Sequence, residues 1–293
     1  MNSLKLTSKT LVLMLGTCAL LLQGCSSPTA STSLAKATPV GQITVVHALP
    51  KAIPSEGSSF AGSQYIFVQA ESAALMLNPI PFVGELAVDA YNKSTTSHYK
   101  DEFIGVDPYQ ITADLSKSRP LFSSSSSGNR NGKAASLYPY VVIQEGADNV
   151  YRMSLIFQLE EPGWTGRYLY HLPTKIPVKD IKKPSQAELD KFRAELTTGA
   201  DILLGLIERD KAGQLESSGK KVDVGSYYIV GSRLIGLVSP DIMVFPNEDL
   251  VEEQADHVIL RCSGKPTDDA HAGGLLFGVH YFAKDQLHSY KVH

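Results

Sequence analysis

Apolar and polar residues alternate along several short segments, and this pattern predicts a β-sheet. In residues 151–159 the apolar side chains fall on every second position, at Tyr151, Met153, Leu155, Phe157 and Leu159. The opposite side carries Arg152, Ser154, Gln158 and Glu160, with Ile156 as the exception. Such alternation is typical of an antiparallel strand with one face in the core and the other in solvent. Segments 138–144 and 167–172 flank it, so three consecutive strands joined by turns are expected.

Further strands are predicted on both sides of these three. They lie at 43–49 and 65–69 before them, and at 225–230, 234–238, 257–262 and 275–282 after them. Residues 287–292 are expected to close a hairpin with the last of these strands through a turn at 283–286. That turn would pair Phe282 with Leu287, Tyr281 with His288, Val279 with Tyr290 and Phe277 with Val292. The last three pairs would form the buried face of the hairpin.

Apolar residues at helical spacing predict two principal helices. One runs from about 81 to 100, with Pro81 at the first position, where a missing N–H costs nothing. The other spans about 185–211, with Ser185 as its cap and Glu188 completing a capping box. Its apolar stripe consists of Leu189, Phe192, Leu196, Ala200, Leu203 and Ile207. A shorter helix is expected to begin at Asp107-Pro108. These elements predict an α+β fold, with a largely antiparallel sheet on which the two principal helices pack.

Two polar stretches divide the chain. Residues 25–41 are rich in Ser, Thr, Ala and Pro, a composition that buries too little apolar area to fold and predicts a flexible tether. Residues 116–136 contain five consecutive serines and are expected to form a disordered loop. We therefore expect one α+β domain over 42–293, and a split into two domains at the Ser-rich loop is the alternative.

The first 24 residues have the layout of an export signal. Lys5 and Lys9 lie in a short basic start, and a mostly apolar run from Leu11 to Leu22 precedes a small-residue cleavage site. The signal ends in Leu22-Gln23-Gly24-Cys25, which resembles the lipobox of bacterial lipoproteins. An ordinary cleaved signal peptide with an unmodified cysteine is the alternative.

The resemblance implies a membrane address. Leu22 and Gly24 would direct signal cleavage, and Cys25 would be lipidated and become the new N-terminus. Several acyl chains on Cys25 would then hold the protein to the bilayer, since each buried methylene contributes about 0.8 kcal/mol. Ser26 rather than Asp follows the cysteine, which by the same resemblance favours the outer membrane, with the domain on the periplasmic side. The segment 79–84 is also similar to one in uncharacterised envelope lipoproteins, and this similarity implies no activity.

Charge and cysteine content narrow the classes of partner and cofactor. The chain has 27 Lys and Arg against 30 Asp and Glu, and loss of the signal lysines leaves 25 against 30. A net charge near −5 argues against nucleic acid as a partner. Cys18 lies in the signal and Cys25 would carry lipid, so Cys262 has no partner for an intrachain disulfide and is expected to be a buried thiol. No cofactor is expected.

The common catalytic motifs are absent from the sequence, including the helical zinc-binding His pair, the Gly-x-Ser-x-Gly elbow and the phosphate-binding glycine loops. Ser-x-x-Lys occurs at 33–36, 97–100 and 217–220, but without the companion motifs of penicillin-binding enzymes. His280, His288 and His293 lie close together in sequence. The predicted hairpin places the first two on opposite faces, so a shared metal ion is not expected.

Three loop residues and one indole are the candidate binding groups. Asp268, Asp269 and His271 gather two carboxylates and an imidazole beside two glycines, as an acid–base or metal site requires. Trp164 lies in a predicted turn, where an exposed ring could stack on a sugar or peptide. His171, in contrast, alternates with apolar neighbours and is expected on the exposed face of its strand.

These observations favour a non-enzymatic, outer-membrane-anchored lipoprotein that binds another protein of the cell envelope. A cell-wall or glycan-binding module that uses Trp164 is the first alternative. A hydrolase that uses the loop with Asp268, Asp269 and His271 is the second.

Overall fold

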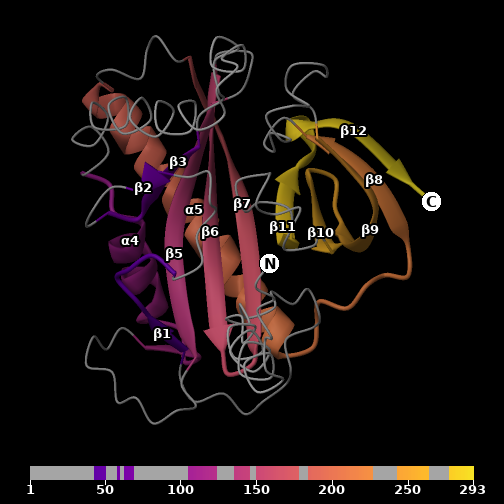
Figure 1. Ribbon diagram of the computed structural model, residues 1–293, viewed down its shortest axis with the longest axis horizontal. Coiled ribbons are helices and arrows are strands. Elements are labelled where there is room, and N and C mark those ends of the chain that lie inside the picture. Colours follow the sequence, from indigo (N-terminus) through magenta and orange to yellow (C-terminus); the bar gives the residue numbers. More distant parts are fainter. Residues whose placement is uncertain are drawn as a thin grey trace, which may run out of the picture.

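The computed structural model describes residues 43–50, 58–59, 63–68, 105–123, 135–145, 150–177, 184–226, 243–263 and 277–293 (Figure 1). Several predicted features lie outside the described residues. They are the signal at 1–24, Cys25, the tether at 25–41, the helix at 81–100 and the strand at 234–238.

The described strands form one twelve-stranded sheet in the order β12-β8-β9-β10-β11-β7-β6-β5-β1-β4, with β3 beside β5 and β2 beside β3. The strands are β1 (Ile43–Val45), β2 (Ser58–Ser59), β3 (Tyr65–Val68), β4 (Phe122–Ser123), β5 (Ser136–Glu145), β6 (Val150–Glu161), β7 (Trp164–Pro177), β8 (Lys221–Ser226), β9 (Met243–Glu253), β10 (His257–Ser263), β11 (Phe277–Ala283) and β12 (Leu287–Val292). Two α-helices, α4 (Pro108–Ser116) and α5 (Gln186–Lys211), complete the described part, with a 3-10 turn, η2 (Lys284–Gln286).

The sheet is mixed but largely antiparallel, which confirms the predicted α+β class. β5, β6 and β7 are consecutive antiparallel strands, as the sequence predicts. β11 joins β7 in parallel, and β8 to β12 curve away from the long strands (Figure 1). Strands from before and after the Ser-rich segment lie in this one sheet, because β1 pairs with both β4 and β5. The described ends of that segment belong to α4, β4 and β5, and the residues between them are outside the description.

The two described helices begin where their capping residues predict. The Ser185 hydroxyl accepts a hydrogen bond from the Glu188 N–H at 3.3 Å, and the Glu188 carboxylate accepts from the Ser185 N–H at 2.7 Å. This capping box confirms the predicted start of α5. At α4, Asp107 accepts from the Tyr109 N–H at 2.8 Å, and Pro108 occupies the first helical turn.

Figure 1 shows α5 crossing the sheet behind β5, β6 and β7. Its buried stripe includes Phe192, Leu196, Leu203 and Ile207, and these side chains belong to a core that also contains Leu155 and Phe157 of β6 and Tyr168 of β7. No helix among the described residues is long and apolar enough to cross a membrane.

The long strands are buried on both faces, which corrects the prediction of a single buried face. Arg152, Ser154 and Gln158 of β6, expected in solvent, are all buried. A second apolar cluster lies on their side of the sheet, with Tyr140, Ile156 and Leu169 among its members. Some polar residues there pair with one another, as where the Arg167 Nε donates to Gln158 Oε1 at 2.9 Å. The alternation of apolar and polar residues therefore describes the polarity of these side chains, but it does not predict their exposure to solvent.

The predicted hairpin at the C-terminus is wrong. β12 pairs with β8, so that Leu287 lies opposite Ser226 and Tyr290 opposite Val224. β11 is occupied on both edges, because Tyr281 lies opposite Ile259 of β10 and Tyr170 of β7. η2 separates the two strands and redirects the chain. Since β11 has no free edge, the short connection cannot form a two-stranded hairpin.

Two further boundaries differ from the prediction. β9 was not predicted, because Pro246 and a run of acidic residues mask its strand character. The predicted strand at 225–230 overlaps only the end of β8.

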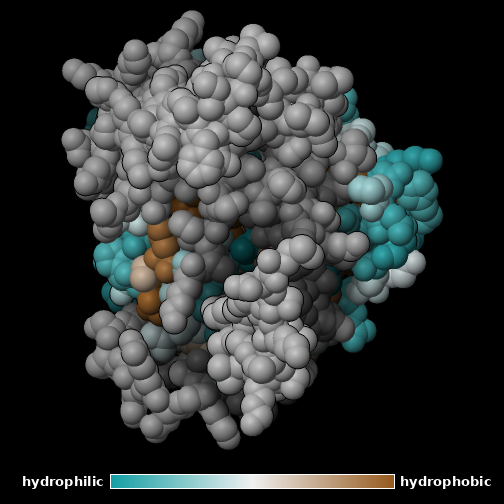
Figure 2. All heavy atoms as spheres, in the orientation of Figure 1, coloured by the Kyte–Doolittle hydropathy of each residue, from teal (hydrophilic) through white to brown (hydrophobic). Residues whose placement is uncertain are grey.

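Most side chains of β12 are exposed, and Figure 2 shows a hydrophilic surface on the side of the molecule where β8 and β12 lie.

Candidate functional site

Three buried polar side chains meet where β6, β7 and β11 adjoin. Ser154 of β6 lies opposite His171 of β7, and His280 of β11 lies opposite Leu169 of β7. Both histidines therefore project from the same face of the sheet, close to the parallel junction between β7 and β11. Their exposed fractions are 1 % for His171 and 0 % for His280. The prediction that His171 lies on an exposed face is wrong, because that face of β7 carries the second core.

The three side chains form a continuous hydrogen-bonded chain. Ser154 Oγ lies 2.8 Å from His171 Nδ1. His171 Nε2 lies 3.2 Å from His280 Nδ1. The main-chain oxygen of His171 also accepts a hydrogen bond from Gln286 Nε2 of η2 at 2.8 Å. The tautomer of each ring decides which nitrogen donates. Both nitrogens of His171 are therefore engaged, and the ring is held in one orientation.

The two imidazoles meet end to end. Their centroids are 5.5 Å apart with an angle of 24° between the planes. This separation is close to the N···N distance plus the two ring radii, so the facing nitrogens lie between the rings, as a hydrogen bond requires. The ring that stacks face to face on His171 is Phe282, at 4.3 Å and 15°. Aromatic and aliphatic groups thus surround the pair.

Burial keeps both histidines neutral. It lowers the pKa of His280 from 6.5 to about 3, because the charged imidazolium would lose its hydration. Burial, and then the proximity of His280, lowers the pKa of His171 well below 6.5. A single hydrogen can bridge the facing nitrogens while both rings remain uncharged. A second proton would place a positive charge in an apolar site.

A serine hydroxyl on an imidazole that is itself oriented by a third group has the geometry of a nucleophile and its general base. Burial excludes this chemistry in the described state, because Ser154 is only 2 % exposed and a substrate could not reach its hydroxyl.

A cavity of about 340 Å³ lies elsewhere, between α4 and α5, where Asp107, Asp114 and Arg193 are among its lining residues. Within the described ranges, no three or more His, Cys, Asp or Glu side chains are grouped to hold a metal ion.

The sequence contained one signal for this pair. His171 and His280 both lie in runs of apolar and aromatic residues, Tyr168-Leu169-Tyr170-His171-Leu172 and Val279-His280-Tyr281-Phe282. Near-continuous apolar runs are typical of strands that are buried on both faces. Their contact joins residues 109 positions apart, and only the β7–β11 pairing establishes it.

Trp164 is not an exposed stacking platform. It begins β7, is 8 % exposed and belongs to the core that packs on α5. Lys211 Nζ lies 5.0 Å from the centre of its ring, and Lys211 also forms an ion pair with Glu161. The turn thus folds over the core, and the indole has a structural role there.

The remaining candidate residues are those of the predicted acidic loop and the C-terminal histidines. Asp268, Asp269 and His271 lie outside the described residues. His288 is exposed, whereas His293 Nε2 lies 2.8 Å from Asp223 Oδ2. His280, the third of the C-terminal histidines, is in the buried pair.

Cys262 is buried and unpaired, as the cysteine count predicts. Burial, followed by Glu248 and Asp249, raises the pKa of its thiol well above the usual value.

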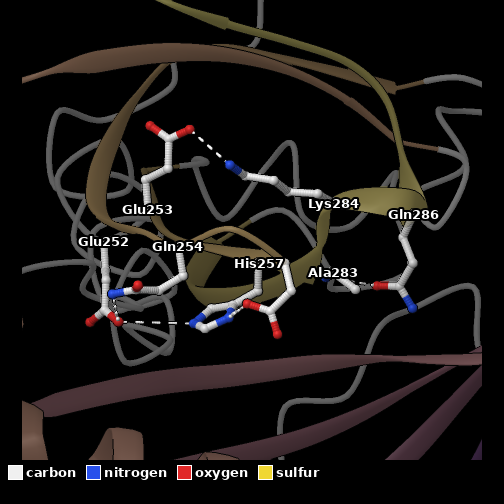
Figure 3. A network of polar contacts seen from close by, with 8 residues as sticks. Glu252, Glu253, Gln254, His257, Ala283, Lys284 and Gln286 are labelled. Atoms are coloured by element: carbon white, nitrogen blue, oxygen red, sulfur yellow. Dashed lines mark hydrogen bonds and ion pairs between the residues drawn. The ribbon is translucent and has the colours of Figure 1, made fainter.

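A second polar cluster surrounds His257 at the turn between β9 and β10 (Figure 3). His257 Nδ1 lies 2.8 Å from Asp256 Oδ1, and its ring stacks on Tyr281 at 4.5 Å. Lys284 Nζ lies 3.0 Å from Glu253 Oε1 in the same view. Lys284 and Glu253 thus form an ion pair, and His257 contacts the neighbouring Asp256. The cluster therefore fastens the β9–β10 turn to the end of β11.

Comparisons of the chain with protein-family models, with curated proteins and with solved structures find no match. The function is accordingly inferred from the residues of this chain.

Proposed function

We propose that this protein is an outer-membrane-anchored lipoprotein of the bacterial envelope, and that its folded part binds another envelope protein without catalysing a reaction. The observation that carries the proposal is the signal that ends in Leu22-Gln23-Gly24-Cys25. A basic start, an apolar core and a small residue before cysteine are together the requirements of lipoprotein processing. Ser26 favours the outer membrane over the inner one.

The segment after Cys25 supports a role beside the membrane. A flexible chain of roughly 17 residues has a root-mean-square length of about 23 Å. The predicted tether would therefore keep the domain within a few tens of ångströms of the bilayer. Such confinement raises the effective concentration of the domain for membrane-bound partners without any added contact.

The burial of the candidate chemical groups favours binding over catalysis. The Ser154–His171 pair resembles a nucleophile and base, but neither side chain reaches the surface. Trp164, the motive for a glycan-binding module, is packed in the core. The exposed faces of α5 and β12 carry mixed polar and charged side chains, which suit a reversible contact with another protein.

Fractionation of cells that express three forms of the full chain tests the anchor. The natural form is expected in the outer membrane. Cys25→Ala is expected as a folded, soluble protein in the periplasm, and Ser26→Asp as a lipidated protein in the inner membrane. Metabolic labelling with a fatty acid should mark the first and third forms only. Outer-membrane recovery of an unlabelled Cys25→Ala protein would contradict the anchor.

Site-specific photo-crosslinking in intact cells tests the partner. Suitable positions are exposed residues on two elements, Lys191 and Thr198 of α5 and His288 and Lys291 of β12. A protein adduct should form reproducibly from one element and not the other, and Cys25→Ala should reduce its yield because confinement is lost. If mass spectrometry finds no reproducible protein adduct from either element, the binding role is wrong.

A further inference from the structure

The ladder between β7 and β11 is a short link between two sets of longer strands. It comprises Val279, His280 and Tyr281 opposite residues 168–170. The neighbouring ladders are longer, because β10–β11 pairs from His257 to Ser263 and β6–β7 pairs from Val150 to Glu161. In the strand order of the described sheet, this junction joins β5–β7 to β8–β12. Opening there would break few backbone hydrogen bonds.

The histidine pair spans this junction. His171 belongs to one set of strands and His280 to the other, and their facing nitrogens are 3.2 Å apart. Ser154 supports His171 from β6, and Gln286 of η2 holds its main-chain oxygen. Gln286 Oε1 in turn accepts from the N–H of Ala283 at 3.2 Å (Figure 3). The contact therefore links both sides of the junction through side chains.

We propose that the His171–His280 pair is a pH-operated latch, and that protonation of its imidazoles opens the β7–β11 junction. The closed junction accommodates two neutral rings whose nitrogens face each other. Two imidazolium rings cannot share that contact, because each would present an N–H to the other. Opening the junction admits water, which hydrates both charges. This inference does not depend on the membrane anchor or on a protein partner.

The sign of the effect follows from proton binding. An imidazole open to water has a pKa near 6.5, whereas burial lowers the pKa of His280 to about 3 and that of His171 well below 6.5. Above pH 6.5 both rings are neutral in either state, and the junction keeps its full stability. Below pH 6.5 the open state binds more protons, so the closed state loses stability as pH falls. For His280 this loss continues down to about pH 3.

The charged groups on this face do not reverse the sign. β6 carries Arg152 two residues before Ser154, and β7 carries Arg167 four residues before His171, so this face holds two cationic side chains. β10 contributes Cys262, whose thiol stays protonated, and β9 contributes Glu248 beyond it. η2 supplies the neutral Gln286.

Hydrogen exchange of the full chain in detergent, measured at pH 7.5 and 5.5 and corrected for the intrinsic rate at each pH, tests the latch. Opening of the amides at 168–170 and 279–281 should increase about 10-fold for one titrating ring and about 100-fold for two. Amides at 140–143 and 153–157 should change much less. An equal change in both sets would overturn the proposal, as would no change at the junction.

Three variants assign the effect to the pair. His280→Gln should reduce the increase to that of one ring, and the combined His171→Gln and His280→Gln variant should abolish it. His288→Gln is the matched control, because His288 is exposed on β12, which pairs with β8 and not with β7 or β11. It should keep the full increase. Persistence of the increase in the double variant would overturn the proposal.

A measurement on the natural chain decides the matter if the Gln variants do not fold. NMR signals of the two buried imidazoles should not titrate between pH 8 and 5.5 while the junction remains closed, and new signals of the open state should grow below pH 6.5. Titration of both rings near pH 6.5 within the closed state would show that protonation costs nothing there. The latch would then be excluded.

Discussion

The hydroxyl of Tyr168 on β7 donates a hydrogen bond to the buried carboxylate of Asp210 in the last turn of α5, with 2.7 Å between Oη and Oδ2. Arg261 of β10 donates to the other carboxylate oxygen, also at 2.7 Å, and to the main-chain oxygen of Leu215. Asp210 is 1 % exposed. Burial and the adjacent carboxylate raise the pKa of Tyr168 well above 10. One carboxylate thus connects α5 to strands on both sides of the β7–β11 junction.

Removal of each of the two donors to Asp210 should lower the free energy of unfolding by a different amount. Arg261→Met leaves a carboxylate buried without its counter-ion and should cost about 3–5 kcal/mol of unfolding free energy. Tyr168→Phe removes one hydrogen bond while Arg261 remains, and should cost about 1–3 kcal/mol. Urea denaturation at pH 7 measures both. Lys117→Met is the control, because its pair with Asp114 is exposed to solvent and should contribute little to the unfolding free energy. Equal losses in all three variants would contradict this ranking.

Gly278 should tolerate no side chain. Its φ is +127°, and a Cβ atom there would lie 2.5 Å from the main-chain oxygen of Arg167 on β7. Gly278→Ala should therefore cost about 2–4 kcal/mol in thermal or urea unfolding, from backbone strain and from separation of the two strands. Gly219→Ala separates these causes. Gly219 also has a positive φ, of +80°, but no atom lies within 4 Å of the added Cβ, so about 1 kcal/mol is expected.

Trp164 should report folding. It is the only tryptophan in the chain and is 8 % exposed, so its fluorescence should be blue-shifted and poorly quenched by acrylamide. Unfolding in urea should shift the emission to the red and restore quenching. Trp164→Ala should cost about 3–5 kcal/mol through loss of core packing. Ready quenching of the native protein would show that the indole is exposed and would restore its candidacy as a stacking surface.

The capping box of α5 should stabilise the helix measurably. Ser185→Ala removes the side-chain acceptor of the Glu188 N–H and should cost about 1 kcal/mol in urea unfolding. Thr197→Ala on the exposed side of the same helix is the control. The Thr197 hydroxyl only donates to the main-chain oxygen of Arg193 within the helix, so its loss should be neutral or slightly stabilising. A larger loss for Thr197→Ala would contradict the role of the cap.

Local features of the chain were predictable. Ser185 and Glu188 predicted the start of α5, because a capping box satisfies N–H groups that lie within four residues of each other. Asp107 and Pro108 predicted α4 because an aspartate can cap the first N–H groups of a helix and proline suits its first turn. The candidate site was not predictable in this way. His171 and His280 looked unrelated, since the contact between them depends on a parallel pairing of strands far apart in sequence. Cys25 and the residues that precede it stay a prediction of the sequence.

By itself, the sequence determined the class of the fold, the start of each described helix and the presence of most strands, because side-chain periodicity and capping act between near neighbours. Only the tertiary structure decided that β12 joins β8, that β11 joins β7, and that Ser154, His171 and His280 are buried together. The physical reason is that both edges of a strand offer the same N–H and C=O groups. Packing over the whole sheet settles which strand edges pair with each other. The same packing settles which polar side chains are buried away from water.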